Sequence, residues 1–332
     1  MKRILKWPLR ILAGLLALLL VAAIVFMMRD SILYSDFYKH SERGWRVPGL
    51  WSGYVSQGFD YCEERGVFLT CGYQKAGRAS RIYILDGEEE IRVDLKYADG
   101  SDYAEHTGGI DTYGPYVYIT GTDGCDLFLL DDVLDGDGRA TMVDQIKTVN
   151  DPAYCTIRGD TLYTGSYYDP GKYETPSEQH MTTPSGEQNT SILSAYALDP
   201  ATGKPYSETP NLIYSTTSHA QGMCFIGNDV LVLSCSYGLS TSLLRFYDLA
   251  ALPTETETMR VGERDVVVAF LDSTSLIETV EAPPMSEEIV WHGDRLWVLS
   301  ESACTKYWFG KLTSGNRIHG LALPTRVAAR VY

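Results

Sequence analysis

The sequence predicts an all-β domain preceded by one N-terminal transmembrane helix. The domain is predicted to be a β-propeller of about five four-stranded blades, with six as the alternative. The first thirty residues hold one long apolar run, and the rest of the chain shows no long stretch of helical periodicity. A short two-strand unit recurs through that remainder at intervals near the length of a propeller blade.

The N-terminal segment predicts a membrane anchor. Residues 11–28 are uncharged, and a helix of that length spans about 27 Å, close to the thickness of the hydrocarbon layer. Four basic residues precede the run, so the tail 1–10 is expected in the cytoplasm and the rest of the chain outside. The alternative is a cleaved signal peptide, for which Val21-Ala22-Ala23 offers a small-residue cleavage site.

On the anchor interpretation, this is a single-pass protein of the cell membrane. Residues 11–28 form the signal-anchor helix, 29–44 a juxtamembrane stalk, and 45–332 the extracytoplasmic propeller. Beyond the first thirty residues the chain holds 23 basic and 42 acidic residues, a net charge of −19. Such a surface does not attract the phosphates of nucleic acid, so no nucleic-acid partner is expected.

The recurring unit consists of a lead-in segment, a strand, a tight polar turn and a second apolar strand. Five copies align, and their matching positions are Gly58, Gly109, Tyr154, Gly222 and Glu288, which lie 51, 45, 68 and 66 residues apart. Because a blade takes about 45 residues, the longer intervals need insertions or conceal a sixth blade. One insertion, at 167–191, has the length of a functional or mobile loop. The last copy lacks an outer strand, which the segment 44–47 could supply, closing the ring.

Cysteines and short motifs exclude several classes of site. All seven cysteines lie beyond the anchor, mostly in apolar strand-like runs where a thiol serves as a small hydrophobe, and their spacing matches no zinc motif. No HExxH, CxxC or phosphate-binding glycine loop is present, so the enzymes that these motifs identify are excluded. Arg158-Gly159-Asp160 spells an adhesion tripeptide, but it falls where sibling copies carry hairpin turns.

One set of candidate site residues follows from the alignment of the five units. In a propeller the first strand of each blade lines the channel, and the aligned polar residues at or near this level are Gln57, His106, His219, Gln221, Glu287 and Glu288. Imidazoles and carboxylates together suit a divalent metal that could activate water, with His106, His219 and Glu287 as its ligands. The alternative is a polar channel that binds only water.

A second set lies at the ends of the second strands. There the alignment brings together Tyr167, Tyr168, Tyr237 and Glu301. Tyrosine offers a flat apolar face with a polar tip, which suits the recognition of a sugar or a peptide. These residues predict a tyrosine-lined binding mouth.

Several segments also carry a resemblance to known proteins. They are 57–59, 106–110, 173–175 with 180–184, 221–222, and 301–302 through 306–307. With them the chain resembles a family of uncharacterised, membrane-anchored or secreted propeller-like proteins of bacteria, from about residue 47 to 323. The resemblance implies a fold and a location outside the cytoplasm, and it implies no activity.

These observations lead to three hypotheses. The first is a membrane-held recognition or scaffold module that binds a small ligand, a glycan or a protein at one propeller mouth. The alternative is a metal-dependent extracytoplasmic hydrolase, lactonase- or glycosidase-like, with its site in the channel. The third is a structural part of an envelope complex, whose mouth a partner would cover.

Overall fold

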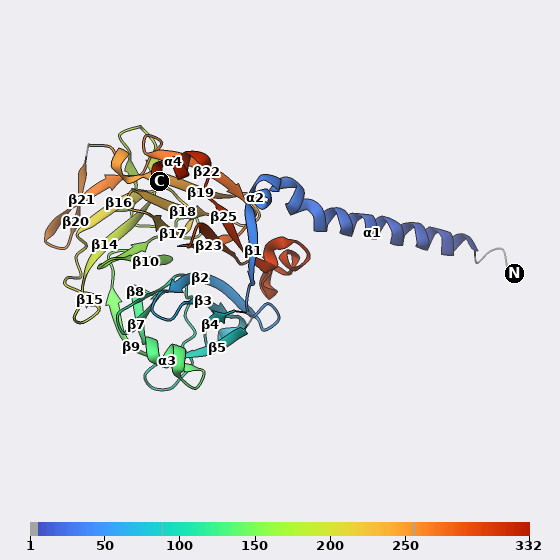
Figure 1. Ribbon diagram of the computed structural model, residues 1–332, viewed down its shortest axis with the longest axis horizontal. Helices are drawn as coiled ribbons and strands as arrows, with labels where there is room; N and C mark the ends of the chain where they lie inside the picture. Colours follow the sequence, from blue (N-terminus) through green and yellow to red (C-terminus); the bar gives the residue numbers. More distant parts are fainter. Residues whose placement is uncertain (1–5, 88, 255) are drawn as a thin grey trace.

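The computed structural model describes residues 6–87, 89–254 and 256–332. One long N-terminal helix extends away from a domain built mostly of β-strands (Figure 1). Within that domain, runs of four strands pair antiparallel, and these groups lie around a common centre (Figure 1). The prediction of a mostly-β domain after one apolar helix is confirmed, and the predicted blade count stays a prediction.

The strand groups follow the chain order. The first comprises β2 (Tyr54–Cys62), β3 (Val67–Gln74), β4 (Arg81–Asp86) and β5 (Glu89–Lys96). The next comprises β6 (Ile110–Tyr113), β7 (Tyr116–Gly121), β8 (Gly124–Leu129) and β9 (Arg139–Lys147). Then come β10 (Tyr154–Arg158), β11 (Thr161–Gly165), β14 (Ser191–Asp199) and β16 (Leu212–Thr216). A further group is β17 (Ala220–Ile226), β18 (Val230–Cys235), β19 (Ser242–Asp248) and β22 (Leu276–Ala282). The last is β23 (Ser286–His292), β24 (Arg295–Ser300), β25 (Arg317–Ala322) and β1 (Ser41–Arg46).

The first strands of these groups, β2, β6, β10, β17 and β23, surround the centre of the domain. Each one contacts the first strand of the next group, and β23 returns to contact β2. At the periphery, parallel pairing of β5 with β9 and of β16 with β21 joins neighbouring groups, so the continuous sheets are larger than four strands.

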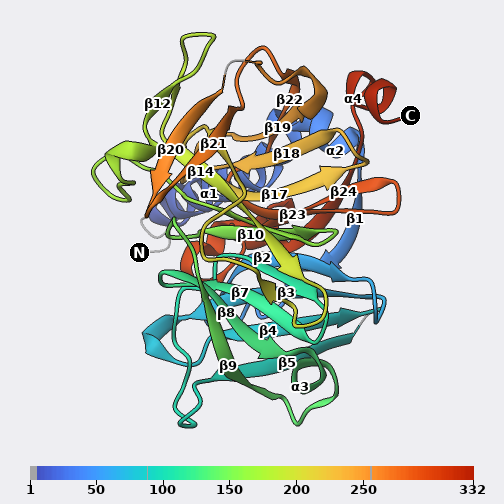
Figure 2. The same ribbon diagram turned by 90° about the vertical axis from the view of Figure 1, so that its left-hand side faces the viewer.

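The two long intervals between repeats contain inserted elements. The interval after β11 holds η2 (Ser177–Gln179), β12 (Met181–Thr182), β13 (Gln188–Asn189) and, after β14, β15 (Lys204–Pro205). The interval after β19 holds η3 (Leu249–Ala251) and the hairpin of β20 (Glu257–Val261) and β21 (Arg264–Phe270). The two insertions lie close together at the edge of the domain (Figure 2), where Glu187 accepts a hydrogen bond from the backbone of Ser273 at 3.0 Å.

Helix α1 (Lys6–Leu33) carries the apolar run of the sequence. Within its segment Arg10–Leu33, an 18-residue window has a mean hydropathy of 3.0 and no buried residue, and the segment is long and apolar enough to cross a membrane or to be a signal sequence. The predicted span 11–28 lies inside this helix, whereas residues 1–5 of the predicted cytoplasmic tail lie outside the described residues.

A short helix and a strand connect α1 to the domain. Helix α2 (Ser35–Lys39) buries Phe37 beside Tyr34 in a core that includes Ile226 and Val327. Strand β1 then pairs antiparallel with β25, as the last repeat was expected to require. The structure thus places α2 and most of β1, which lie within the predicted stalk 29–44, against the β domain.

Glycine at position 44 lets this strand approach the last group closely. A Cβ atom there would lie 2.5 Å from the Trp297 ring. The adjacent Trp45 ring contacts both Phe68, on β3, and Trp297, on β24, at centroid distances of 4.4 and 5.1 Å. The N-terminal strand therefore seals the contact between the last strand group and the first.

The apolar core lies between neighbouring strand groups. One cluster joins the first two groups through Leu69, Ile82, Val117 and Phe128, and similar clusters lie between the other neighbours. The seven cysteines are buried and free, as predicted for thiols that pack as small apolar side chains. The remaining elements are peripheral: α3 (Leu130–Asp135), α4 (Thr325–Val331), η1 (Lys75–Gly77), η4 (Thr305–Leu312) and η5 (Ser314–Asn316).

Candidate functional site

β-Bulges set the polar side chains at one end of the ring of first strands. The pairing of β2 with β3 skips Gln57, that of β17 with β18 skips Gln221, and that of β23 with β24 skips Glu287 and Glu288. A bulge leaves its extra residue out of the ladder and re-aims the side chain. The alignment of Gln57, Gln221 and Glu287 in the sequence thus corresponds to a shared structural feature.

A glycine follows two of these bulges, because the neighbouring first strand approaches too closely there for a Cβ atom. A Cβ atom on Gly58 would lie 2.8 Å from the backbone nitrogen of Ile110, and one on Gly222 would lie 2.4 Å from the Cα atom of Glu288. The first strands therefore contact one another through their backbones here, and the bulged side chains are left at the mouth.

Strained backbone marks the same level. His219 and Met285, which directly precede β17 and β23, adopt positive φ angles of 62° and 66°, and Gly53 before β2 has a φ of 84°. A residue other than glycine in this conformation costs about 1–3 kcal/mol and persists only where its surroundings hold it. The lead-in to β17 is held by a hydrogen bond from the His219 backbone nitrogen to the carbonyl of Tyr168, at 3.2 Å.

The polar centre of the mouth is formed by Gln57, Glu287 and Glu301. Gln57 donates from Nε2 to a Glu301 carboxylate oxygen at 2.9 Å and to the carbonyl of Ser56 at 2.8 Å. Glu287 is only 2% exposed, and its Oε1 has no hydrogen-bond partner among the described residues. A buried acceptor without a donor is costly, so this atom is an unfilled position in the site.

The two carboxyl groups retain protons more strongly than free glutamate. Burial raises the pKa of Glu301 to about 7, although the positive charge of Lys306 opposes this shift. Burial, and after it the charge of Glu301, raises the pKa of Glu287 well above its ordinary value. Near neutral pH the pair therefore holds a proton that it can lose when a cation approaches.

Aromatic side chains surround this centre. We call the five residues Tyr73, Tyr167, Tyr173, Tyr237 and Tyr307, together with Glu287 and Glu301, the tyrosine mouth. The Tyr167 ring lies 5.6 Å from that of Tyr173, and Tyr173 and Tyr237 are about half exposed. After burial, the charge of Glu287 is among the causes that raise the pKa of both Tyr167 and Tyr307.

Two imidazoles lie at the rim of the mouth. His219 stacks on Tyr237 with ring centroids 4.9 Å apart, and its Nε2 lies 3.2 Å from Asp169. His106 lies against the Tyr73 ring at 4.6 Å, and burial with the nearby Lys306 charge lowers its pKa. Each imidazole is thus engaged with a partner of its own.

The structure does not group the three predicted metal ligands, and the metal site stays a prediction. Among the described residues, no group of three or more His, Cys, Asp and Glu side chains is arranged to hold a metal ion. His106, His219 and Glu287 do not form such a group, because the first two are held at the rim by Tyr73, Asp169 and Tyr237.

Of the other predicted site residues, some lie at the tyrosine mouth and some do not. The structure brings Gln57, Tyr167, Tyr237, Glu287 and Glu301 to the tyrosine mouth. Gln221 lies at the same bulge level and is half-buried. Tyr168 instead packs on His180 of the insertion, with ring centroids 5.0 Å apart.

Sequence reasoning missed the loop residues of the mouth, which include Lys306, Tyr307, Tyr173 and Asp169. The Lys306 ammonium group donates to the Tyr73 hydroxyl at 2.7 Å. These residues come from η4 and from the insertion, where strand periodicity offers no register. The only signal was that three of them fall in segments that carry the family resemblance.

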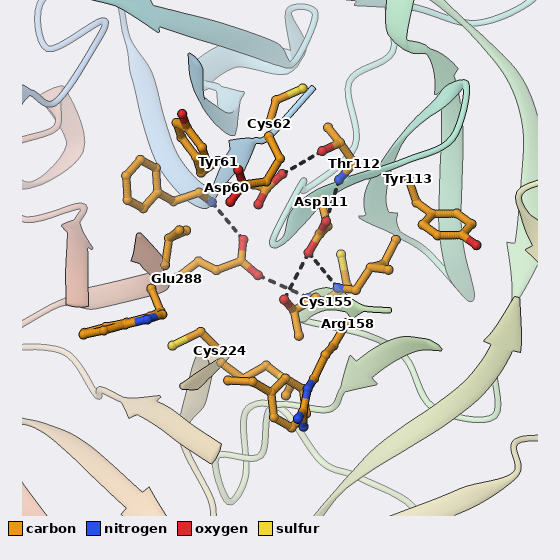
Figure 3. Close-up of a pocket in the computed structure, with 18 of the residues that line it drawn as sticks. Asp60, Tyr61, Cys62, Asp111, Thr112, Tyr113, Cys155, Arg158, Cys224 and Glu288 are labelled. Carbon is orange, nitrogen blue, oxygen red and sulfur yellow. Dashed lines mark hydrogen bonds between the residues drawn. The ribbon is translucent and has the colours of Figure 1, made fainter. Parts of the chain in front are cut away.

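Glu288 was predicted beside Glu287, but it serves a separate pocket at the other ends of the first strands (Figure 3). Its carboxylate accepts hydrogen bonds from the backbone nitrogens of Phe59, Ile110 and Cys155, at 2.8, 3.1 and 3.3 Å. The pocket has a volume of about 380 Å³, and Asp60 and Asp111 also line it. Burial raises the pKa of both aspartates, that of Asp60 to about 7.

The aspartates of this pocket already accept hydrogen bonds from other residues of the domain. Asp111 accepts from the Thr156 hydroxyl at 3.0 Å and from the Ile157 backbone nitrogen at 2.6 Å, and Asp60 accepts from the Thr112 hydroxyl at 3.2 Å (Figure 3). They tie adjacent first strands together. We therefore assign the pocket a structural role and place the candidate site at the tyrosine mouth.

Comparison with known proteins shows only distant likeness. No family model and no curated protein matches the chain, so the family resemblance stays a prediction. Among solved structures it is similar to an oxidoreductase described as a glucose dehydrogenase, from Thermus thermophilus, with 11% identity and a TM-score of 0.42 over 85% of this chain and 99% of that one. It is also similar to glutaminyl cyclase from Myxococcus xanthus, with 9% identity and a TM-score of 0.45 over 86% and 97% of the two chains. At such low scores neither likeness transfers an activity to this chain.

Proposed function

We propose that this protein is a recognition module, a five-bladed β-propeller held at the cell membrane, which binds a small ligand, a glycan or a protein at the tyrosine mouth. The ring of first strands, each opening a four-stranded group, supports the five-bladed assignment. The N-terminal strand β1, paired with β25, would close the last blade and leave no open edge.

The proposed location rests on helix α1. An 18-residue window of its apolar segment has no buried residue, and an exposed apolar surface of this size is stable in a bilayer rather than in water. Basic residues precede it in the sequence, which supports a cytoplasmic N-terminus and an extracytoplasmic domain.

One observation carries the recognition function: the unfilled acceptor of Glu287 at the base of a mouth walled by tyrosines. Binding sites combine aromatic walls with a few polar groups that fix the orientation of the ligand. Here Gln57, Glu287 and Glu301 supply the polar groups, while the partly exposed Tyr173 and Tyr237 offer ring surface to a partner.

A hydrolase that works without a metal is the second candidate. The observation that favours it is the carboxyl pair of Glu287 and Glu301, whose pKa values are both raised. Glycosidases use two carboxyl groups, one of them protonated, to cleave a glycosidic bond. Turnover of chromogenic glycosides that is lost in both Glu287→Gln and Glu301→Gln would favour this candidate over simple recognition.

A ligand screen tests the recognition function. The full chain in detergent micelles is screened for thermal stabilisation by small molecules, oligosaccharides and peptides, because a ligand at 100 times its Kd adds about 2.7 kcal/mol. Hits should stabilise the wild type but not Glu287→Gln or Tyr237→Ala. The matched controls are Glu263→Gln, in the exposed turn between β20 and β21, and Tyr206→Ala, a 69% exposed tyrosine on another loop. Hits that stabilise all four variants equally would place binding elsewhere and contradict the proposal.

A further inference from the structure

We infer that the group recognised at the tyrosine mouth is a primary ammonium, which donates a hydrogen bond to Oε1 of Glu287 while it lies against the neighbouring tyrosine rings. This inference rests on the proposed recognition function and names the chemistry of its ligand. Three features of the mouth support it: an acceptor without a donor, ring faces that already attract ammonium groups, and a carboxyl pair that can exchange its proton for a cation.

The acceptor is the first step. In its ionised form Glu287 offers only acceptors, and its Oε1 is buried without a partner among the described residues, so a group that binds as the carboxyl pair loses its proton must donate a hydrogen bond to this atom. The amide of Gln57 is already committed to Glu301 and to the carbonyl of Ser56. A donor therefore has to come from outside the described residues, and a charged donor gains more than a neutral one.

The protein's own lysines show what the ring faces attract. The Lys306 ammonium lies 4.9 Å from the ring centroid of Tyr307 and 5.4 Å from that of Tyr73. The Lys172 ammonium lies 4.9 Å from the ring centroid of Tyr173. Three of the five tyrosines thus already hold a primary ammonium in cation–π contact, which is the contact that a ligand would make with the others. Tyr167 has no such cation among the described residues, and after burial the nearby charges of Asp169 and Glu287 raise its pKa.

Charge balance is the third step. Glu287, Glu301 and Asp169 lie in or beside the mouth, against the ammonium of Lys306 and the more distant Lys172. The chain beyond the anchor carries a net charge of −19, which concentrates cations around it. A cation that displaces the proton of the carboxyl pair supplies the positive charge that the proton gave, whereas a neutral sugar brings no charge in its place.

Two sources can present a primary ammonium, a lysine side chain and a free amino terminus. Four probes distinguish them from each other and from a sugar: Nα-acetyl-lysine N-methylamide, the same molecule acetylated on Nε, alanyl-alanine N-methylamide with a free amino terminus, and the neutral disaccharide N,N′-diacetylchitobiose. Each is titrated against the full chain in detergent micelles and followed by saturation-transfer NMR.

The expected result is that at least one of the two free amines binds tenfold or more tightly than the Nε-acetylated probe. This preference should vanish in Glu287→Gln and persist in Glu263→Gln. Because Glu287 is buried and its variant could lose stability, Tyr237→Ala is measured as well, with a loss of affinity expected for the amines.

The outcomes separate the inference from the function on which it rests. Binding of N,N′-diacetylchitobiose that depends on Glu287 and Tyr237, without binding of either amine, overturns the ammonium inference and leaves recognition at the mouth intact. If neither free amine binds more tightly than the Nε-acetylated probe, the inference is also overturned. If no probe binds in a way that depends on the mouth, and the wider screen gives no such hit, both proposals fail.

Discussion

Glu288 joins three first strands through a single carboxylate. It accepts from the backbone nitrogens of Phe59, Ile110 and Cys155, so its removal would leave three buried donors without a partner. We expect Glu288→Ala to lower the free energy of unfolding by about 3 kcal/mol or more, as measured by chemical unfolding. Glu63→Ala, at an exposed position next to the same pocket, is the control. A loss below about 1 kcal/mol would show that water replaces the carboxylate, which would contradict the structural role.

The pKa of Glu301 makes a prediction about pH. The folded protein keeps this proton up to a pH of about 7, whereas the unfolded chain releases it near its ordinary pKa of 4.5. Between these values the folded state binds more protons, so the free energy of unfolding decreases as pH rises through the window. The groups that face Glu301 are Gln57, Glu287, Lys306, Tyr307 and Lys172.

Glu301→Gln removes this titration and keeps an acceptor for Gln57. The variant should therefore lose less stability than the wild type between pH 5 and pH 8, by up to about 3 kcal/mol, in unfolding experiments at both pH values. Glu263→Gln should follow the wild type. Parallel curves for wild type and Glu301→Gln would mean that the carboxyl titrates like a solvated one.

At this scale the sequence predicts some residues of the site and not others, for a physical reason. Gln57, Gln221 and Glu287 align because each sits in a bulge at one level. Glu288 follows Glu287 directly, and adjacent side chains of a strand point to opposite sides. A shift of one position along the strand therefore moves a side chain from the tyrosine mouth to the pocket. Lys306 and Tyr307 come from a loop whose path no periodicity predicts.

Strand β1 and helix α2 complete the β domain at its N-terminal end. A chain that begins at residue 31 keeps both, whereas one that begins at residue 47 loses the partner of β25 and the cover over Trp297. We expect the longer form to fold as a monomer and the shorter form to aggregate or to melt at least ten degrees lower, because an unpaired edge strand invites association. Size-exclusion chromatography and thermal melts compare the two. Equal melting temperatures would show that β1 does not close the domain.

Turn chemistry explains why the strand elements could be predicted better than the insertions. Gly159, Gly227 and Gly293 all adopt positive φ in hairpins between first and second strands, and the interpretation of Arg158-Gly159-Asp160 as such a turn is confirmed. The hairpin of β20 and β21 has the same local signals, but β21 pairs in parallel with β16. Non-local pairing of this kind is decided by tertiary contacts that the local sequence does not encode.

At the scale of the whole molecule, the charge and the packing of the centre decide whether a metal is needed. The central carboxylates of Glu288, Asp111 and Asp60 are satisfied by backbone nitrogens and hydroxyls, and the described residues contain no metal-binding group. The fold therefore does not need a cation to neutralise its centre. Removal of divalent metal should leave the stability of the protein unchanged.

The measurement is the melting temperature of the full chain in detergent with and without EDTA. Because the domain is strongly acidic, added ions alone raise its stability by screening self-repulsion, so the control is sodium chloride at matched ionic strength. We expect the two melting temperatures to agree within about one degree, which for a domain of this size corresponds to well under 1 kcal/mol. A drop of several degrees in EDTA alone, with a stoichiometric metal in the untreated protein, would contradict this expectation. It would return the metal-dependent hydrolase to consideration, with ligands outside the geometry described for His106, His219 and Glu287.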